Sequence, residues 1–236
     1  YASMLAALGI PTTLIDKRPR LLEFADAEII DRLQKQMKEL GVTLYHDEEV
    51  RAIKKAPDNS IHVELRHAQP IHASTLMYAI GRVGATKGLN REATGLKSDN
   101  RGRLSVNEHF QTAIPHIYAA GDVIGFPALA ATSMQQGRHA SCHAFGHPDR
   151  IDNSLLPYGI YSIPQISMVG RNEEELSRAG VPYAVGTARY KEIARGLLMG
   201  DETGMLKLLF HRQTYELLGV HIIGEGQETR RNLVFG

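Results

Sequence analysis

One run of residues constrains the fold more than any other: HIYAAGDVIGFPALAATSMQQG, from His116 to Gly137. Its β-rich, apolar start ends on Asp122 and is followed by small residues and a helical segment, Leu129 to Ala144. A carboxylate in that position is costly to desolvate unless it has a partner. Ligands of open α/β sheets bind at the carboxyl ends of strands. The pattern therefore predicts that Asp122 accepts hydrogen bonds from a ligand, and the alternative is a plain helix N-cap.

The first 81 residues alternate between helical and β-rich segments. Apolar residues fall at helical spacing between Ala25 and Leu40, and Gly41 ends that pattern. Further segments are expected to be a short helix at 1–8, strands at 11–16 and 42–46, antiparallel strands at 49–55 and 60–66, and a buried strand at 74–81. The order predicts a parallel core with a small antiparallel flap.

The predicted secondary structure of the chain changes in type after a polar, proline-bounded linker at 148–157. Before the linker, residues 104–112 and 116–122 are expected to be strands. After it, residues 158–170 are extended, 172–180 form a short helix capped near Asn172, and 183–190, 204–211 and 216–224 are strand candidates. This tail is typical of an α+β domain with an antiparallel sheet.

Composition excludes several classes of function. The 236 residues carry a net charge of +1 without a long basic block, which argues against nucleic acid and membrane surfaces as partners. No apolar run reaches the length of a bilayer span. Cys142 is the only cysteine, so a reducing compartment, the cytoplasm, fits best. It lies between His139 and His143, a spacing that could ligate zinc, but a polar helix face is the favoured interpretation.

Asp16 is a second candidate binding residue. In a Rossmann unit, an acid at the end of the second strand binds the adenosine ribose hydroxyls. The spacing fits if the glycine-rich turn of that unit lies just before Tyr1. Arg18 and Arg20 follow at once, and arginines in this place pair with the 2′-phosphate of NADP. We expect a site that accepts both dinucleotides, and the alternative is an ordinary strand-end aspartate beside a solvated basic loop.

Four separated segments resemble the two-dinucleotide-binding flavoprotein reductases, the pyridine nucleotide-disulfide oxidoreductases. YAAGDVIGFPALAATSMQQGR looks like their second FAD signature, and LMYAIGRVGATKGL resembles the segment that closes their NAD domain. YASMLAALG resembles the helix after their NAD-site glycines, and YGIYSIPQISMVGRNEEEL the opening of their interface domain. Within that family, ARGLLMG and LKLLFHRQTYELLGVHIIGE point to the transhydrogenases, which use FAD to move hydride between NADH/NAD and NADPH/NADP.

The resemblance implies roles for single residues but no catalytic side chain and no metal. Asp122 with Gly121 would bind the ribityl chain of FAD, and Leu129 and Ala130 would present backbone to its ring. For the nicotinamide dinucleotide the implied residues are Asp16, Arg18, Arg20, Val50 beside the adenine and Gly81 near the nicotinamide. Ala85 departs from the family, which often has asparagine there.

The expected fold class is α/β, an incomplete Rossmann-like two-dinucleotide-binding flavoprotein fold with part of an α+β dimerisation domain. Its expected parts are an NAD(P) domain at 1–82, a segment of the FAD domain at 83–150 and an interface domain at 151–236. Neither glycine-rich loop is present and GEGQETRRNLVFG leaves the family pattern, so we expect an internal piece of a homodimeric protein. The alternatives are a disulfide oxidoreductase like dihydrolipoamide dehydrogenase and an inactive nucleotide-binding remnant.

Overall fold

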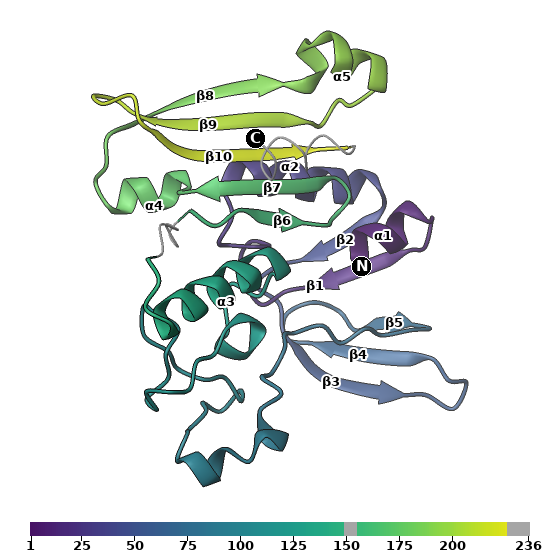
Figure 1. The fold of residues 1–236 in the computed structure, drawn as a ribbon. Coiled ribbons are helices and arrows are strands. Elements are labelled where there is room, and N and C mark those ends of the chain that lie inside the picture. Colours follow the sequence, from purple (N-terminus) through teal and green to yellow (C-terminus); the bar gives the residue numbers. More distant parts are fainter. Residues whose placement is uncertain (149–154, 226–236) are drawn as a thin grey trace. The chain divides into compact units, whose positions relative to one another are not determined.

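The computed structural model describes residues 1–148 and 155–225, which fall into two compact units (Figure 1). The larger unit joins residues 1–78 with the segment from Tyr158 onward, and the smaller unit comprises residues 79–157. The larger unit therefore combines two stretches that are far apart in the sequence. Within the described residues, no helix is long and apolar enough to cross a membrane.

The chain begins with a short βαβ arrangement preceded by one helix. Strands β1 (Thr12–Ile15) and β2 (Val42–Tyr45) pair in parallel, with Thr12 opposite Val42, and helix α2 (Ala27–Glu39) connects them. Helix α1 (Ala2–Ala7) precedes β1. Asp26 caps α2 by accepting a hydrogen bond from the Glu28 N–H at 3.1 Å. These four elements lie where the residue pattern predicts them.

A three-stranded antiparallel sheet follows. It comprises β3 (Val50–Lys55), β4 (Ile61–Leu65) and β5 (Ile71–Ala73) in the order β3-β4-β5. The predicted hairpin of β3 and β4 is confirmed, with Asn59 at φ 67° in its turn. The strand predicted at 74–81 is wrong, because residues 75–80 have no regular structure. Met77, Tyr78 and Ile80 in that run are exposed, and no other described strand pairs with it, so its apolar character alone does not make it a strand.

The C-terminal part forms a five-stranded antiparallel sheet in the order β6-β7-β10-β9-β8. The strands are β6 (Tyr158–Ile160), β7 (Gln165–Gly170), β8 (Tyr183–Arg189), β9 (Met205–His211) and β10 (Leu217–Gly224). Helix α4 (Glu173–Arg178) begins with a capping box, in which Asn172 and Glu175 each accept a backbone hydrogen bond from the other. The cap near Asn172 is thus confirmed. A further helix, α5 (Ala194–Met199), was not predicted.

Helix α2 packs against this five-stranded sheet, so the two distant stretches share one core (Figure 1). The apolar face of α2 is fully buried, and its members are Ile29, Ile30, Leu33 and Met37. The sheet contributes Ile166 and Met168 from β7, Met205 from β9 and Ile223 from β10. Burying each such side chain is worth about 1.5–3 kcal/mol, so this contact contributes substantially to the apolar stabilisation of the larger unit.

The smaller unit is mostly irregular. Helix α3 (Ala130–Ala144) is confirmed, but the strands predicted at 104–112 and 116–122 are wrong. Only the isolated bridges Ser98–Leu104 and Gln111–Tyr118 occur in those runs. A strand needs a ladder of partners, and the described part of this unit supplies single bridges instead. The predicted linker at 148–157 lies largely outside the described residues.

Candidate functional site

Asp16 and Arg18 form an ion pair at the carboxyl end of β1. The Arg18 side chain donates from Nε to Asp16 Oδ1 at 2.9 Å and from Nη2 to Oδ2 at 2.5 Å, and the Arg18 N–H also donates to Oδ1 at 3.0 Å. Burial alone would raise the pKa of Asp16, but these bonds and the guanidinium charge outweigh it and hold that pKa below its usual value. The site thus offers one carboxylate and one guanidinium at the same sheet edge.

The backbone around this pair is held by the neighbouring strand. The Asp16 N–H donates to the Tyr45 carbonyl at 2.9 Å, and the Glu48 N–H donates to the Asp16 carbonyl at 3.2 Å. The Asp47 N–H donates to the Arg18 carbonyl at 3.2 Å. Asp16 and Arg18 are therefore presented from a fixed turn, although the Arg18 side chain remains 45% exposed.

The structure does not bring Arg20 to Asp16. Its Nη1 instead lies 3.2 Å from Oε1 of Glu174 in α4, while Arg20 Nε and Glu174 Oε2 are buried without a hydrogen-bond partner among the described residues. Val50 is the first residue of β3, where it is exposed and pairs with Leu65 of β4. At the sheet edge that could bind a dinucleotide, Asp16 and Arg18 therefore pair with each other, and the second arginine, Arg20, is held by Glu174 of α4.

Glu48 is a buried carboxylate that sequence reasoning missed. Its oxygens accept from the N–H groups of Glu49, Arg66, His67 and Ala68 at 2.7–3.1 Å. Burial acts to raise the pKa of Glu48, but these four donors lower it to about 2. Because the donors lie up to 20 residues away in the sequence, no local pattern marks this position. Its role is to join the β2–β3 connection to the end of β4.

In the smaller unit, Gly121 and Asp122 lie in a 3-10 turn at 121–124, not at the end of a strand. The Asp122 carboxylate is 43% exposed and lies 3.4 Å from the Arg82 guanidinium. The Gly121 N–H donates to the buried Gln136 Oε1 at 2.7 Å. A Cβ on Gly121, at φ 82°, would come within 3.0 Å of Ser133 Oγ, so the turn needs glycine to lie this close to α3.

The first turn of α3 is open. Leu129 is its N-cap residue but supplies no side-chain cap, and Ala130, the first helical residue, is exposed. The buried Thr132 Oγ1 has no hydrogen-bond partner among the described residues. Unsatisfied N–H groups at a helix N-terminus favour acceptor oxygens of a ligand. Gly81 lies elsewhere in this unit, in an exposed irregular stretch at φ 134°.

The two histidines of α3, His139 and His143, both contact the ring of His109. His143 stacks on His109 with ring centroids 4.2 Å apart, and His143 Nδ1 lies 2.8 Å from the Tyr118 hydroxyl. His109 Nδ1 lies 3.4 Å from His139 Nε2. Among the described residues no group of three or more metal-ligating side chains is placed to hold an ion, and Cys142 is a free thiol.

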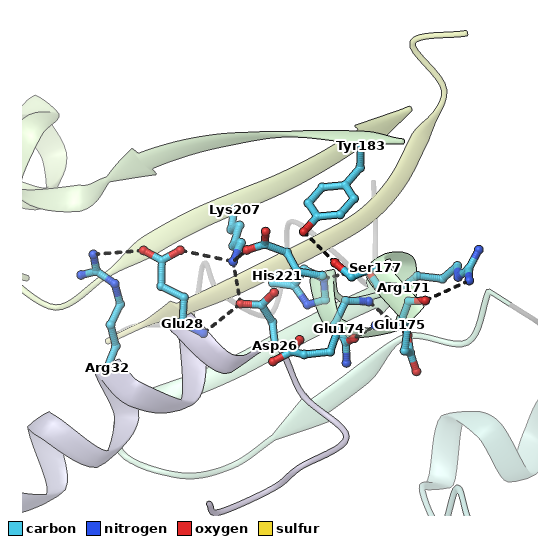
Figure 2. Close-up of polar contacts among 12 residues, drawn as sticks. Asp26, Glu28, Arg32, Arg171, Glu174, Glu175, Ser177, Tyr183, Lys207 and His221 are labelled. Atoms are coloured by element: carbon cyan, nitrogen blue, oxygen red, sulfur yellow. Dashed lines mark hydrogen bonds and ion pairs between the residues drawn. The ribbon is translucent and has the colours of Figure 1, made fainter. Parts of the chain in front are cut away.

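A buried charged cluster lies between the N-terminus of α2 and the five-stranded sheet (Figure 2). Lys207 in β9 is 1% exposed, and its Nζ lies 2.8 Å from Asp26 Oδ1 and 3.2 Å from Glu28 Oε2. It also donates to Glu173. Burial acts to lower the pKa of Lys207, but its bonds to Asp26 and Glu173 outweigh burial and raise that pKa, so the ammonium stays charged.

His221 in β10 lies directly opposite Lys207 in the sheet. Its Nε2 lies 3.0 Å from the Arg171 carbonyl and so carries the proton, while Nδ1 is buried without a partner in the described structure. Burial lowers the pKa of His221. The sequence offered no signal for this cluster, because Asp26 and Lys207 are 181 residues apart.

Comparison with known proteins places these features in context. The family profile described as pyridine nucleotide-disulphide oxidoreductase matches residues 1–137, and the dimerisation-domain profile of the same family matches residues 156–233. The chain is 49% identical over 224 residues to the soluble pyridine nucleotide transhydrogenase of Mycobacterium tuberculosis and 45% identical over 226 residues to that of Vibrio parahaemolyticus. These matches include 95% of this chain, but the chain spans only about half, 48%, of the length of each relative.

Solved structures give the same picture of the fold. The HOCl-induced flavoprotein disulfide reductase RclA of Escherichia coli matches with a TM-score of 0.87 and 27% identity, over 99% of this chain and 54% of that chain. LpdA of Mycobacterium tuberculosis matches with a TM-score of 0.85 and 24% identity, over 94% of this chain and 49% of that chain. The expected fold class, an incomplete Rossmann-like flavoprotein fold with part of a dimerisation domain, is thus confirmed.

Proposed function

Because the chain belongs to the pyridine nucleotide-disulphide oxidoreductase family, we propose that the whole protein is an FAD-dependent transhydrogenase that moves hydride between NADH/NAD and NADPH/NADP. Relatives 44–49% identical to this chain carry the name soluble pyridine nucleotide transhydrogenase. The observation that carries the proposal is the Asp16–Arg18 pair. A transhydrogenase must accept dinucleotides with and without a 2′-phosphate, and this pair holds one group suited to each.

We propose that the two nucleotides separate this pair in opposite ways. The adenosine ribose of NAD offers hydroxyl donors, which Asp16 accepts once Arg18 turns toward solvent. The 2′-phosphate of NADP takes the Arg18 guanidinium in a bidentate, charge-assisted contact, and Asp16 is left to solvent. Val50 would lie beside the adenine and Gly81 near the nicotinamide. Arg20 would join the phosphate contact only if it released Glu174.

For FAD, the residues of the smaller unit fit what the cofactor requires. Asp122 is exposed enough to accept from ribityl hydroxyls, and its partner Arg82 is 84% exposed and free to move. The open first turn of α3, after Leu129 and at Ala130, leaves backbone donors for ring oxygens. Thr132 Oγ1 has no hydrogen-bond partner in the part of the chain that the structure describes, so it could bond to the cofactor. Gly121 keeps the turn close to the helix. The bound flavin would supply the electron-carrying chemistry, and these residues would hold and orient it.

The remaining parts of the proposal concern organisation. The dimerisation-domain match supports a homodimer of the whole protein, in which residues 1–82 serve the NAD(P) domain, 83–150 the FAD domain and 151–236 the interface. The name of the relatives and the single cysteine support a cytoplasmic location. A disulfide reductase is the second candidate, favoured by the likeness to RclA. Since Cys142 is the only cysteine, its redox pair would have to come from residues outside this chain.

The first test is a visible absorption spectrum of the purified chain, with the bound small molecule released and identified, followed by titration with NADH and NADPH. Release of FAD and binding of both nucleotides support the proposal. The whole protein is then assayed for transfer of hydride from NADPH to an NAD analogue, and for reduction of a disulfide. A whole protein that reduces a disulfide but transfers no hydride between nucleotides would overturn the transhydrogenase proposal in favour of the second candidate.

A further inference from the structure

The loop that joins Asp16 to helix α2, residues 17–26, is held along its length by the C-terminal part of the larger unit. Near its start, Arg20 pairs with Glu174 of α4 at 3.2 Å. Further along, Asn172 Nδ2 donates to the Phe24 carbonyl at 3.2 Å, and the Phe24 ring lies 5.9 Å from the Tyr158 ring. Each of these contacts joins the loop to residues about 130–150 positions away. The loop is therefore positioned by tertiary contacts as well as by its own turns.

The end of the loop is held most firmly. Asp26 is the N-cap of α2 and is 1% exposed, and its Oδ1 contacts both the Glu28 N–H and the Lys207 ammonium (Figure 2). Lys207 is equally buried and contacts Glu173 at the start of α4 as well. One side chain of β9 thus bridges the first turns of two helices.

The charges of this cluster make its geometry specific. Three carboxylates surround one ammonium, so removing Lys207 alone would leave buried negative charge without compensation. Apolar contacts tolerate sliding, whereas a buried ion pair with hydrogen-bond geometry fixes a register. Because Lys207 contacts Asp26, the N-cap residue of α2, this contact fixes the position at which α2 begins and at which loop 17–26 ends.

We propose that Lys207, together with Glu174 and Asn172, positions loop 17–26 so that Asp16 and Arg18 meet the adenosine end of a nicotinamide dinucleotide. These residues act through the loop and touch no ligand, so they are positioning residues. The inference rests on the proposed function, because it assigns the loop a nucleotide. It implies that changes in the dimerisation-domain part of the chain alter nucleotide affinity without altering any nucleotide contact.

The test separates positioning from stability. The triple variant Asp26→Asn/Glu173→Gln/Lys207→Met removes the buried charges while keeping side-chain size and an N-cap acceptor. Glu174 is left unchanged, so that Arg20 stays paired with it and adds no contact to a phosphate. We expect the affinity of this chain for AMP and for 2′,5′-ADP, measured by calorimetry, to fall at least about tenfold. We also expect amide hydrogen exchange at residues 17–25 to accelerate, while the strands of the five-stranded sheet keep their protection.

The matched control is Lys35→Met/Glu39→Gln, which removes an exposed ion pair from the other end of the same helix, 3.8 Å across. It is expected to change neither affinity nor loop exchange. Unchanged loop exchange in the cluster variant overturns the inference, and so does unchanged affinity beside a loop that exchanges faster. If the unmodified chain binds neither probe, both the nucleotide assignment of the loop and this inference are wrong. Loop exchange in the cluster variant then reports only whether the Lys207 contacts hold loop 17–26 in place.

Discussion

Asp16 and Arg18 form an ion pair at one edge of a sheet, and our proposal assigns one group of this pair to each nucleotide. Removing the acid would free the guanidinium and remove the acceptor that we propose for ribose hydroxyls. A charge-assisted hydrogen bond is worth about 1.5–3 kcal/mol, or roughly ten- to a hundredfold in affinity. The sequence indicated an acid at a strand end followed by arginines, but it did not predict that Asp16 and Arg18 pair with each other.

For Asp16→Ala we expect the ratio of NAD to NADP affinity to fall by about tenfold or more, measured from the dissociation constants of AMP and 2′,5′-ADP. Asp31→Ala, an exposed acid on α2, is the control and should leave the ratio unchanged. An equal ratio in the Asp16 variant and the unmodified chain would mean that Asp16 only shapes the turn.

Asp122 makes the corresponding prediction for FAD. For Asp122→Ala in the whole protein, retention of FAD is expected to weaken by about tenfold or more, because a ligand hydroxyl loses its acceptor. The measurement is the flavin absorbance that remains with the protein after gel filtration. Glu92→Ala, an exposed acid in the same unit, serves as control. Full flavin content in the Asp122 variant would count against this role.

Glu48 predicts a pH dependence of stability. Its pKa is lowered from 4.5 to about 2 in the folded chain, so its contribution is fully present above pH 4.5 and is lost as the pH falls through about 2. In Glu48→Gln the amide offers a donor where four N–H groups require acceptors. The variant should therefore have a lower Tm than the unmodified chain at neutral pH, with a difference that narrows between pH 4.5 and 2. A difference that does not change with pH would contradict this account.

At the scale of elements, the sequence was informative wherever a segment carries its own pattern. Helix α2 has apolar residues at helical spacing, and strands β7 to β10 lie within runs rich in apolar and β-branched residues; each is found near its predicted bounds. The runs at 74–81 and 116–122 are mostly apolar and the run at 104–112 mixes apolar and polar residues. Whether any such run is a strand depends on a partner that the run does not contain. Helix α5 was missed because its apolar residues, including Leu197 and Leu198, are exposed and show no buried face.

The capping box of α4 allows local and tertiary contributions to be separated at Asn172. Asn172→Ala removes the cap for the Glu175 N–H and the bond to the Phe24 carbonyl, and should cost about 1–2 kcal/mol. Asn172→Asp keeps the cap but sets a carboxylate against that carbonyl. We expect Asp to restore helix capping and leave the Phe24 end of loop 17–26 exchanging faster. Equal Tm for the two variants would show that the cap contributes little.

At the scale of the whole chain, the buried partners escaped sequence reasoning for one reason. Lys207 meets Asp26, and Glu48 meets Arg66 to Ala68, only after distant segments have folded together. A lysine in a strand pattern is ordinarily assigned to the solvent face. The family resemblance indicated the candidate binding residues, but it did not indicate which of their side chains would pair with other residues of the fold. Arg20, which pairs with Glu174, is the clearest case.

The shared core of α2 and the five-stranded sheet argues that residues 158–225 do not unfold independently of residues 1–78. Ile30 is fully buried in that core with Ile166 and Ile223. Ile30→Ala should cost about 2–5 kcal/mol and accelerate amide exchange in β7, β9 and β10 as well as in α2. Val63→Ala, in the three-stranded sheet, should leave the exchange of those strands unchanged. If Ile30→Ala accelerates exchange in α2 alone, the five-stranded sheet is an independent folding unit. The sheet would then have to position loop 17–26 through the polar contacts of Lys207, Glu174 and Asn172 alone.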